Sequence, residues 1–275
     1  MRPFRFLLPL WLGLAVLAAP AASSAQVVVG VSIRVAPPLL PVYVQPPIPA
    51  AGYLWMPGYW AYGPAGYYWV PGTWVEPPAV GLLWTPGYWG WSNGLYVWHA
   101  GYWGPHIGFY GGVNYGFGYI GTGFVGGFWA HGVFNYNRAF ANVRGVHVVT
   151  YNKTVIVNRV NISFNGGPHG LHARPTPQQE AFAREAHHGP TPLQEQHEHA
   201  AAGNHALLAS VNHGRPAVAA SRHPGVFEGH EVVAAHGANP PGHGGPPPHP
   251  QAHPGPAGEH HGNDHHEDHH DEHHD

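Results

Sequence analysis

The chain has 275 residues, of which only 9% are charged, against roughly 25% in ordinary soluble domains. Its 39 glycines and 31 prolines are typical of low-complexity sequence, but 13% of the residues are aromatic, which excludes a simple disordered chain. The absence of cysteine excludes disulfides, thiol chemistry and a lipid-modified cysteine. We therefore expect a compact aromatic β-region flanked by segments that do not fold alone.

The N-terminus has the pattern of a secretory signal peptide. Arg2 and Arg5 precede an apolar run over residues 6–18, and small residues at 23–25 provide a cleavage site. We expect residues 1–25 to be removed and the mature chain to be exported to the periplasm, the outer membrane or the medium. The alternative is a single transmembrane anchor. It is disfavoured because the run is shorter than the roughly 20 residues of a span, and no later stretch is long enough either.

Residues 26–50 are predicted to form a strand and a proline-rich linker. The run VVVGVSIRV is rich in β-branched residues, which favour strands. The following APPLLPVYVQPPIPA carries proline at a density that favours extended polyproline II structure. We interpret this part as a stiff linker or an edge segment.

Residues 51–105 contain one short motif four times: WMPGYW at 55–60, WVPGTW at 69–74, WTPGYW at 84–89 and WHAGYW at 98–103. Proline fixes the first φ of a type II turn and glycine accepts the positive φ that follows. Each copy therefore predicts a hairpin that turns between its two tryptophans. The predicted turn residues are Pro57, Gly58, Pro71, Gly72, Pro86, Gly87 and, where Ala100 replaces proline, Gly101.

The four hairpins would place their aromatic side chains on one face of an antiparallel β-meander. In the first copy Trp55 would lie opposite Trp60 as a cross-strand pair. The predicted aromatic face consists of Trp55, Trp60, Trp69, Trp74, Trp84, Trp89, Trp98 and Trp103. This face is either the core of the repeats or a contact surface for a protein, a glycan or a membrane interface.

Residues 106–165 are predicted to hold a Gly/aromatic segment and a further β-hairpin. Glycine weakens isolated strands, so residues 104–132 either pair against the repeats or stay loose. VHVVTYNKTVIVN at 146–158 predicts the hairpin, with its turn near Asn152 and Lys153. GFGYIG at 116–121 formally matches a dinucleotide-binding loop. The preceding strand, the following helix and the later acidic residue are missing, so we exclude nucleotide binding.

Residues 166–235 are predicted to contain short helices and linkers. TPQQE at 176–180 and TPLQE at 191–195 each offer threonine as N-cap, proline at the first helical position and glutamine at the third. Helices this short need a partner surface or are transient. Residues 236–275 consist mainly of Gly, Pro, His and acidic residues, which predicts a disordered tail.

With its four W-x-x-G-x-W copies, the segment 51–105 resembles the YXWGXW (WXXGXW) repeat-containing proteins of Gram-negative bacterial envelopes. The Gly/aromatic block up to residue 165 is of the kind that follows such repeats. The resemblance implies an exported or outer-membrane-associated protein with no established enzymatic activity. Some members resemble lipoproteins, and this chain departs from them because it lacks cysteine.

The tail offers candidate metal ligands. EHHGNDHHEDHHDEHHD at 259–275 mixes imidazole with carboxylate, a donor set that suits Zn, Ni or Cu. The candidate ligands are His260, His261, His265, His266, His269, His270, His273 and His274. The alternative is a solvated tail, and we expect no other cofactor. HEDHH at 266–270 matches the zinc-protease motif only formally, since no ordered helix, third ligand or pocket is predicted there.

These features predict a mainly β, exported, non-enzymatic cell-envelope protein whose aromatic repeats are structural or adhesive. Between residues 27 and 179 the only carboxylate is Glu76, which leaves little equipment for acid–base catalysis. The six basic residues of that stretch form no basic patch, so we expect envelope components (glycan, outer-membrane surface or protein) as partners, not nucleic acid. One alternative is a periplasmic protein that binds or buffers divalent metals through its tail. A third hypothesis is a tail that responds to pH.

Overall fold

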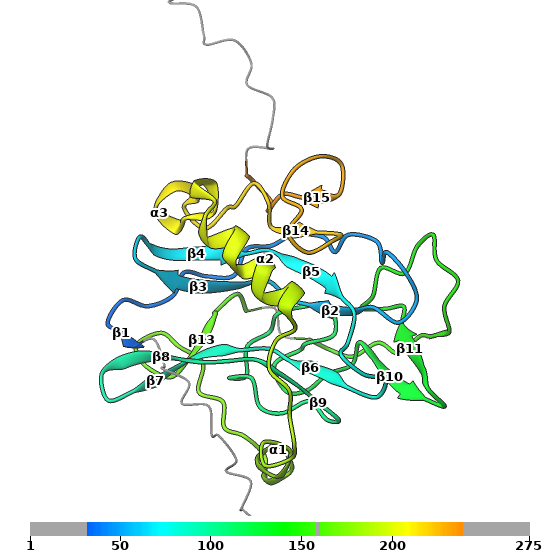
Figure 1. The fold of residues 1–275 in the computed structure, drawn as a ribbon. Coiled ribbons are helices and arrows are strands. Elements are labelled where there is room, and N and C mark those ends of the chain that lie inside the picture. Colours follow the sequence, from blue (N-terminus) through cyan, green and yellow to red (C-terminus); the bar gives the residue numbers. More distant parts are fainter. Residues whose placement is uncertain (1–31, 158–159, 239–275) are drawn as a thin grey trace, which may run out of the picture. The chain divides into compact units, whose positions relative to one another are not determined.

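The computed structural model describes residues 32–157 and 160–238, and Figure 1 shows their fold. The prediction of a mainly β protein with antiparallel hairpins in the repeat region is confirmed. Within these residues no helix is both long and apolar enough to span a membrane. The predicted signal peptide, the start of the predicted strand at 26–31 and almost all of the predicted tail lie outside the described residues.

The repeats form two interrupted hairpins and not four simple ones. In the first, β2 (Leu54–Met56) pairs with β5 (Gly72–Val75), and β3 (Tyr59–Gly63) pairs with β4 (Gly66–Val70). In the second, β6 (Leu83–Thr85) pairs with β9 (Tyr102–Gly104), and β7 (Tyr88–Ser92) pairs with β8 (Leu95–His99). The predicted pairing was therefore wrong, because Trp55 lies opposite Trp74 and Trp60 lies opposite Trp69.

Backbone conformation explains why the chain does not turn at the Pro-Gly dipeptides. A type II turn needs a positive φ at its glycine, and the positive φ values of the repeats occur elsewhere. Gly66 has φ 100°, and Asn93 and Gly94 have φ 50° and 81°. Asn-Gly is a strong signal for a tight hairpin turn, so the Asn93-Gly94 pair in the sequence marks the true turn of the second hairpin.

The Pro-Gly sites instead interrupt the strands where the two arms of each hairpin approach closely. A Cβ atom added to Gly58 would lie 2.8 Å from the Gly72 nitrogen and 2.3 Å from Cζ2 of Trp69. In the second hairpin a Cβ on Gly87 would lie 2.9 Å from the Gly101 nitrogen. Only glycine permits this approach, which is a different use of the residue from the one that we predicted.

The two hairpins pack on each other, and short strands from later parts of the chain extend both. In Figure 1 the first hairpin lies above the second. β14 (Ala220–Ser221) runs parallel to β5 and also pairs with β15 (Val232–Val233). β13 (Phe164–Asn165) runs parallel to β7, and β1 (Ser32–Ile33) pairs with β8. The core between the layers is therefore built from the repeats and completed by distant segments.

A three-stranded sheet, called the third sheet below because it follows the two repeat hairpins, contains the hairpin of residues 106–165. This hairpin lies in a different place from the one predicted. β10 (Gly127–Ala130) pairs with β11 (Val133–Asn137), and β12 (Thr150–Tyr151) runs parallel to β11. The expected hairpin at 146–158 was wrong. The amide of Asn137 donates to the Lys153 carbonyl and its oxygen accepts from the Lys153 N–H, so this stretch is tied to β11 and does not fold back on itself.

Two segments contribute to the core: the one predicted as a stiff linker or an edge segment, and the one predicted either to pair against the repeats or to stay loose. In the proline-rich segment Leu40 and Ile48 are buried. Their N–H groups donate to the carbonyls of Asn161 and Asn142. In the Gly/aromatic segment 104–132 Tyr110, Val113, Tyr115 and Tyr119 are buried, so this stretch is packed and not loose.

Both predicted helices form, each with the predicted capping box. They are α1 (Pro177–Phe182), capped by Thr176, and α2 (Pro192–Ala202), capped by Thr191. α2 packs against β4 and buries Gln194, His197 and Ala201, whereas α1 buries no residue. A 3-10 turn at His205–Leu207 and α3 (Ala209–Asn212) follow.

Candidate functional site

The structure places the repeat tryptophans inside the protein. Seven of the eight are buried, and Trp98 is half-buried. Their rings meet as four cross-strand pairs with centroids 5.1–5.3 Å apart: Trp55–Trp74, Trp60–Trp69, Trp84–Trp103 and Trp89–Trp98. The predicted turn prolines and the glycines at 58, 72 and 87 are buried too, and Gly101 is half-buried. The aromatic face is therefore core in this structure.

Most of the buried indole N–H groups reach backbone carbonyls far along the chain. Trp60 donates to Leu39 (3.0 Å) and Trp74 to Pro46 (2.9 Å), both in the proline-rich segment. Trp69 donates to Ala219 (2.9 Å), beside β14. Because a buried N–H without an acceptor is costly, these bonds fix the flanking segments against the repeats.

A partly open groove of about 1390 Å³ lies where the proline-rich segment meets the third sheet. Its walls come mainly from residues 40–45, 114–117 and 138–148, with further contributions from the stretch 150–157. Most of the lining is aliphatic or aromatic. Val42 and Val44 line it and remain 47% and 59% exposed. The groove is larger than the roughly 300–1,000 Å³ of typical small-molecule pockets.

The groove is lined by basic side chains and by no acidic ones. Arg138, Arg144 and His147 are exposed members of its lining, and His236 contributes from the other wall. No residue of this lining is Asp or Glu. The groove can therefore attract a ligand whose anionic group lies near the basic side chains and whose apolar part covers the apolar lining.

One polar side chain is buried in the groove wall with part of its hydrogen-bonding capacity unused. The side-chain oxygen of Gln45 accepts from the Asn142 N–H at 2.7 Å, and its backbone carbonyl accepts from the Asn142 side chain at 2.9 Å. These bonds hold the two walls together. Gln45 is 6% exposed, and among the described residues its Nε2 has no acceptor. An amide nitrogen in this position can donate to a bound oxygen.

Comparison with protein families finds the WXXGXW repeat in two copies, at residues 51–75 and 80–103. The chain therefore contains two WXXGXW repeats, as the resemblance of residues 51–105 to that repeat family predicted. Each family copy coincides with one of the interrupted hairpins, so one WXXGXW repeat contains two of the W-x-x-G-x-W motifs counted in the sequence. No curated protein and no solved structure matches the chain.

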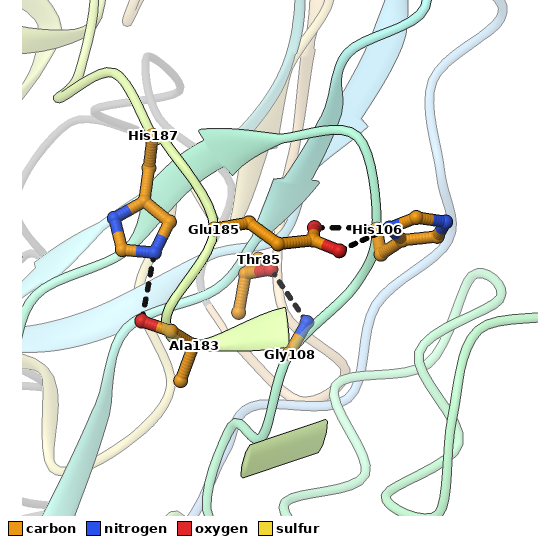
Figure 2. A network of polar contacts seen from close by, with 6 residues as sticks. All are labelled: Thr85, His106, Gly108, Ala183, Glu185 and His187. Carbon is orange, nitrogen blue, oxygen red and sulfur yellow. Dashed lines mark hydrogen bonds and ion pairs between the residues drawn. The ribbon is translucent and has the colours of Figure 1, made fainter. Parts of the chain in front are cut away.

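A polar network lies beside the second WXXGXW repeat, and Figure 2 shows it. Nδ1 of His106 lies 2.9 Å from a Glu185 oxygen, and Nε2 of His187 donates to the Ala183 carbonyl at 3.0 Å. The Thr85 hydroxyl accepts from the Gly108 N–H. In addition, the backbone N–H of Trp103 in β9 donates to the His188 carbonyl, and the N–H of His188 donates to the Trp103 carbonyl. This network attaches the segment after α1 to the repeat.

The described residues contain no group of three or more His, Cys, Asp or Glu side chains placed to hold a metal ion. The eight tail histidines predicted as ligands lie outside the described residues, so that prediction stands as it was made. Sequence reasoning did not single out Gln45, Asn142, Arg138 or Arg144. The arginines were counted only among the six basic residues between residues 27 and 179, and nothing in the proline-rich segment indicated that it forms a groove wall.

Proposed function

We propose that the protein is an exported, non-enzymatic component of the cell envelope, in which the WXXGXW repeats are the structural core and the adjacent groove is the binding surface. The observation that carries the proposal is the burial of the repeat tryptophans beside a groove lined by exposed valines and basic side chains. Tryptophans that form the core are not available to bind a glycan or a membrane. The groove is then the surface with the chemistry of a binding site.

Two features support the remaining parts of the proposal. The basic, apolar and small-residue regions of residues 1–25 support export. The groove lining lacks carboxylates, which supports binding over acid–base catalysis.

Export is tested by expressing the full chain in a Gram-negative host and separating cytoplasm, periplasm and membranes. We expect a product that begins at Gln26 and is found outside the cytoplasm. The matched control is the double variant Leu7→Arg, Leu8→Arg, which interrupts the apolar run and should leave an unprocessed chain in the cytoplasm. Full-length, cytoplasmic protein from the unaltered sequence would overturn the proposed export, and robust hydrolase activity of the purified mature chain would overturn its non-enzymatic role.

Binding of divalent metals by the tail is a second candidate function, supported by the density of imidazole and carboxylate at 259–275. We expect calorimetric titration with Zn²⁺, Ni²⁺ or Cu²⁺ to give heat with the mature chain 26–275 but much less with a chain that ends at residue 235. A deletion strain lacking 236–275 should also grow differently under excess metal. Equal binding by both chains, or unchanged growth, would count against this function.

A further inference from the structure

We propose that the groove binds one molecule of an anionic phospholipid, with its acyl chains against the valine and aromatic lining and its phosphate at the arginines. The inference rests on the proposed function, because such a ligand requires a protein that reaches the envelope. It adds the chemical class of the ligand and the residues that hold it.

The apolar part of the groove fits acyl chains. Val42 and Val44 are large aliphatic side chains that stay exposed on one wall, and Phe117 and Phe140 are half-buried members of the same lining. Covering such surface contributes roughly 25 cal/mol per Å². Scattered exposed valines need no explanation, but exposed apolar residues gathered in one groove indicate a binding site.

The basic part fits a phosphate. The guanidinium groups of Arg138 and Arg144 each present a planar set of donors that matches phosphate oxygens, and such charge-assisted bonds are among the strongest in proteins. Since the lining has no carboxylate, neither arginine is neutralised by an acidic partner within the groove.

Gln45 supplies the independent observation. Its Nε2 is buried in the groove wall and, within the described residues, has no acceptor, although the oxygen of the same amide is bonded to the Asn142 N–H. A buried donor left without a partner costs about 1–3 kcal/mol. Nε2 exposes almost no surface, so a phosphate or ester oxygen would reach it after a shift of the Gln45 side chain toward the groove, and the new bond would remove that cost.

An acidic peptide fits the groove less well than a lipid. A peptide brings a donor and an acceptor at almost every residue, and each must be satisfied once it is buried. The groove offers more aliphatic and aromatic side chains than polar ones, and the polar ones come from several separate segments of its lining. Acyl chains have no hydrogen-bonding groups that must be satisfied when they are buried.

The test is calorimetry of the mature chain 26–275 with dihexanoyl phosphatidylglycerol below its micelle concentration, alongside dihexanoyl phosphatidylcholine and an oligoglutamate peptide. We expect saturable one-to-one binding of the anionic lipid, at least tenfold tighter than that of the other two. Binding of phosphatidylglycerol vesicles without binding of the monomeric lipid would replace the groove by a membrane-surface contact. Equal affinity for both lipids, tighter binding of the peptide, or no binding would each overturn the proposal.

Variants locate the ligand in the groove. Arg138→Gln with Arg144→Gln should weaken binding at least tenfold, whereas Arg174→Gln with Arg184→Gln, an equal charge change at exposed residues outside the lining, should change it less than twofold. Val44→Asp places a carboxylate in the groove and should abolish binding. Val80→Asp, at a residue 67% exposed outside the lining, is its control.

Gln45→Glu tests the unpartnered amide. It keeps an oxygen for the Asn142 N–H but replaces the donor by a negatively charged acceptor, so binding should be lost. Binding is compared only among variants whose urea unfolding midpoint equals that of the unaltered protein. If the arginine pair and its control behave alike, the groove is not the site. Failure here in a protein that is correctly processed and exported overturns the lipid inference alone and leaves the export proposal standing.

Discussion

Most buried indoles of the repeats carry a polar N–H whose acceptor lies outside their own hairpin strand. Trp69 is 1% exposed, stacks edge-on against Trp60 and donates to the Ala219 carbonyl. Its ring also lies directly over Gly58. One residue thus connects both arms of the first repeat to a segment about 150 residues later.

Trp69→Phe should lower the free energy of unfolding by roughly 2–3 kcal/mol, because it removes a buried hydrogen bond and leaves a cavity. The matched control is Trp98→Phe, at the half-buried repeat tryptophan, which should cost less than about 1.5 kcal/mol. Urea unfolding of the two variants measures the difference. Equal losses would show that the indole bond to Ala219 contributes nothing.

His197 is held as a neutral side chain by two backbone groups. One ring nitrogen, Nε2, donates to the Pro71 carbonyl and the other, Nδ1, accepts from the Gly225 N–H, both at 2.8 Å. Burial lowers the pKa of His197 from 6.5 to about 4, partly offset by the bond to Pro71. A second proton would break the bond to Gly225.

Stability should therefore fall as the pH decreases from about 6.5 to about 4, because the unfolded chain binds a proton at this histidine in that range and the folded chain does not. Over this pH range His197 should lower the free energy of unfolding by about 3 kcal/mol. His197→Gln should have a shallower dependence of unfolding free energy on pH between 4 and 6.5. If the two pH profiles run parallel, the prediction is wrong.

At the scale of the element, the Pro-Gly sites are points where the two arms of a hairpin approach closely, and not turns. Pro57, Pro71 and Pro86 are buried together with the glycines that follow them. The two arms stay paired with each other on both sides of the interruption, because β2 pairs with β5 and β3 pairs with β4. The even spacing of the motifs thus reflects one interrupted hairpin per repeat.

Gly58→Ala should lower the free energy of unfolding by roughly 3 kcal/mol, at the upper end for an overpacked core, because the new methyl group meets backbone as well as a ring. Gly189→Ala is the control, since a Cβ there has no atom within 4 Å. Thermal unfolding of both variants provides the comparison. A Gly58→Ala protein as stable as its control would contradict the close approach of the arms.

At the scale of the whole molecule, the repeats act as a frame on which the rest of the described chain is arranged. The proline-rich segment, β13, β14 and α2 all attach to the two hairpins through indole bonds, short parallel pairings or helix packing. Every tryptophan in the described residues is buried or half-buried.

The tryptophan emission of the mature chain, which lacks Trp11, should therefore be blue-shifted and poorly quenched by iodide. Unfolding in urea should shift it to the red and make it accessible. Emission that is fully quenched under native conditions would contradict the buried core and return the aromatic face to the role of a contact surface.

The sequence predicted what depends on local chemistry. Both helices begin at the threonine and proline that formed the capping-box pattern, because an N-cap bond involves residues only three positions apart. The repeat composition predicted short antiparallel hairpins with aromatic cross-strand contacts. It did not predict their partners, since a Pro-Gly dipeptide suits a type II turn as well as a strand interruption.

The sequence by itself determined the β class, the WXXGXW repeats and the two capped helices. The tertiary structure decided that Trp55 pairs with Trp74, that Leu40 and Ile48 of the proline-rich segment belong to the core and that Gln45 lies in a groove with Arg138 and Arg144. Those features depend on contacts between residues far apart in the chain. Such contacts follow from packing and from the need of each buried donor for an acceptor, and no local pattern records them.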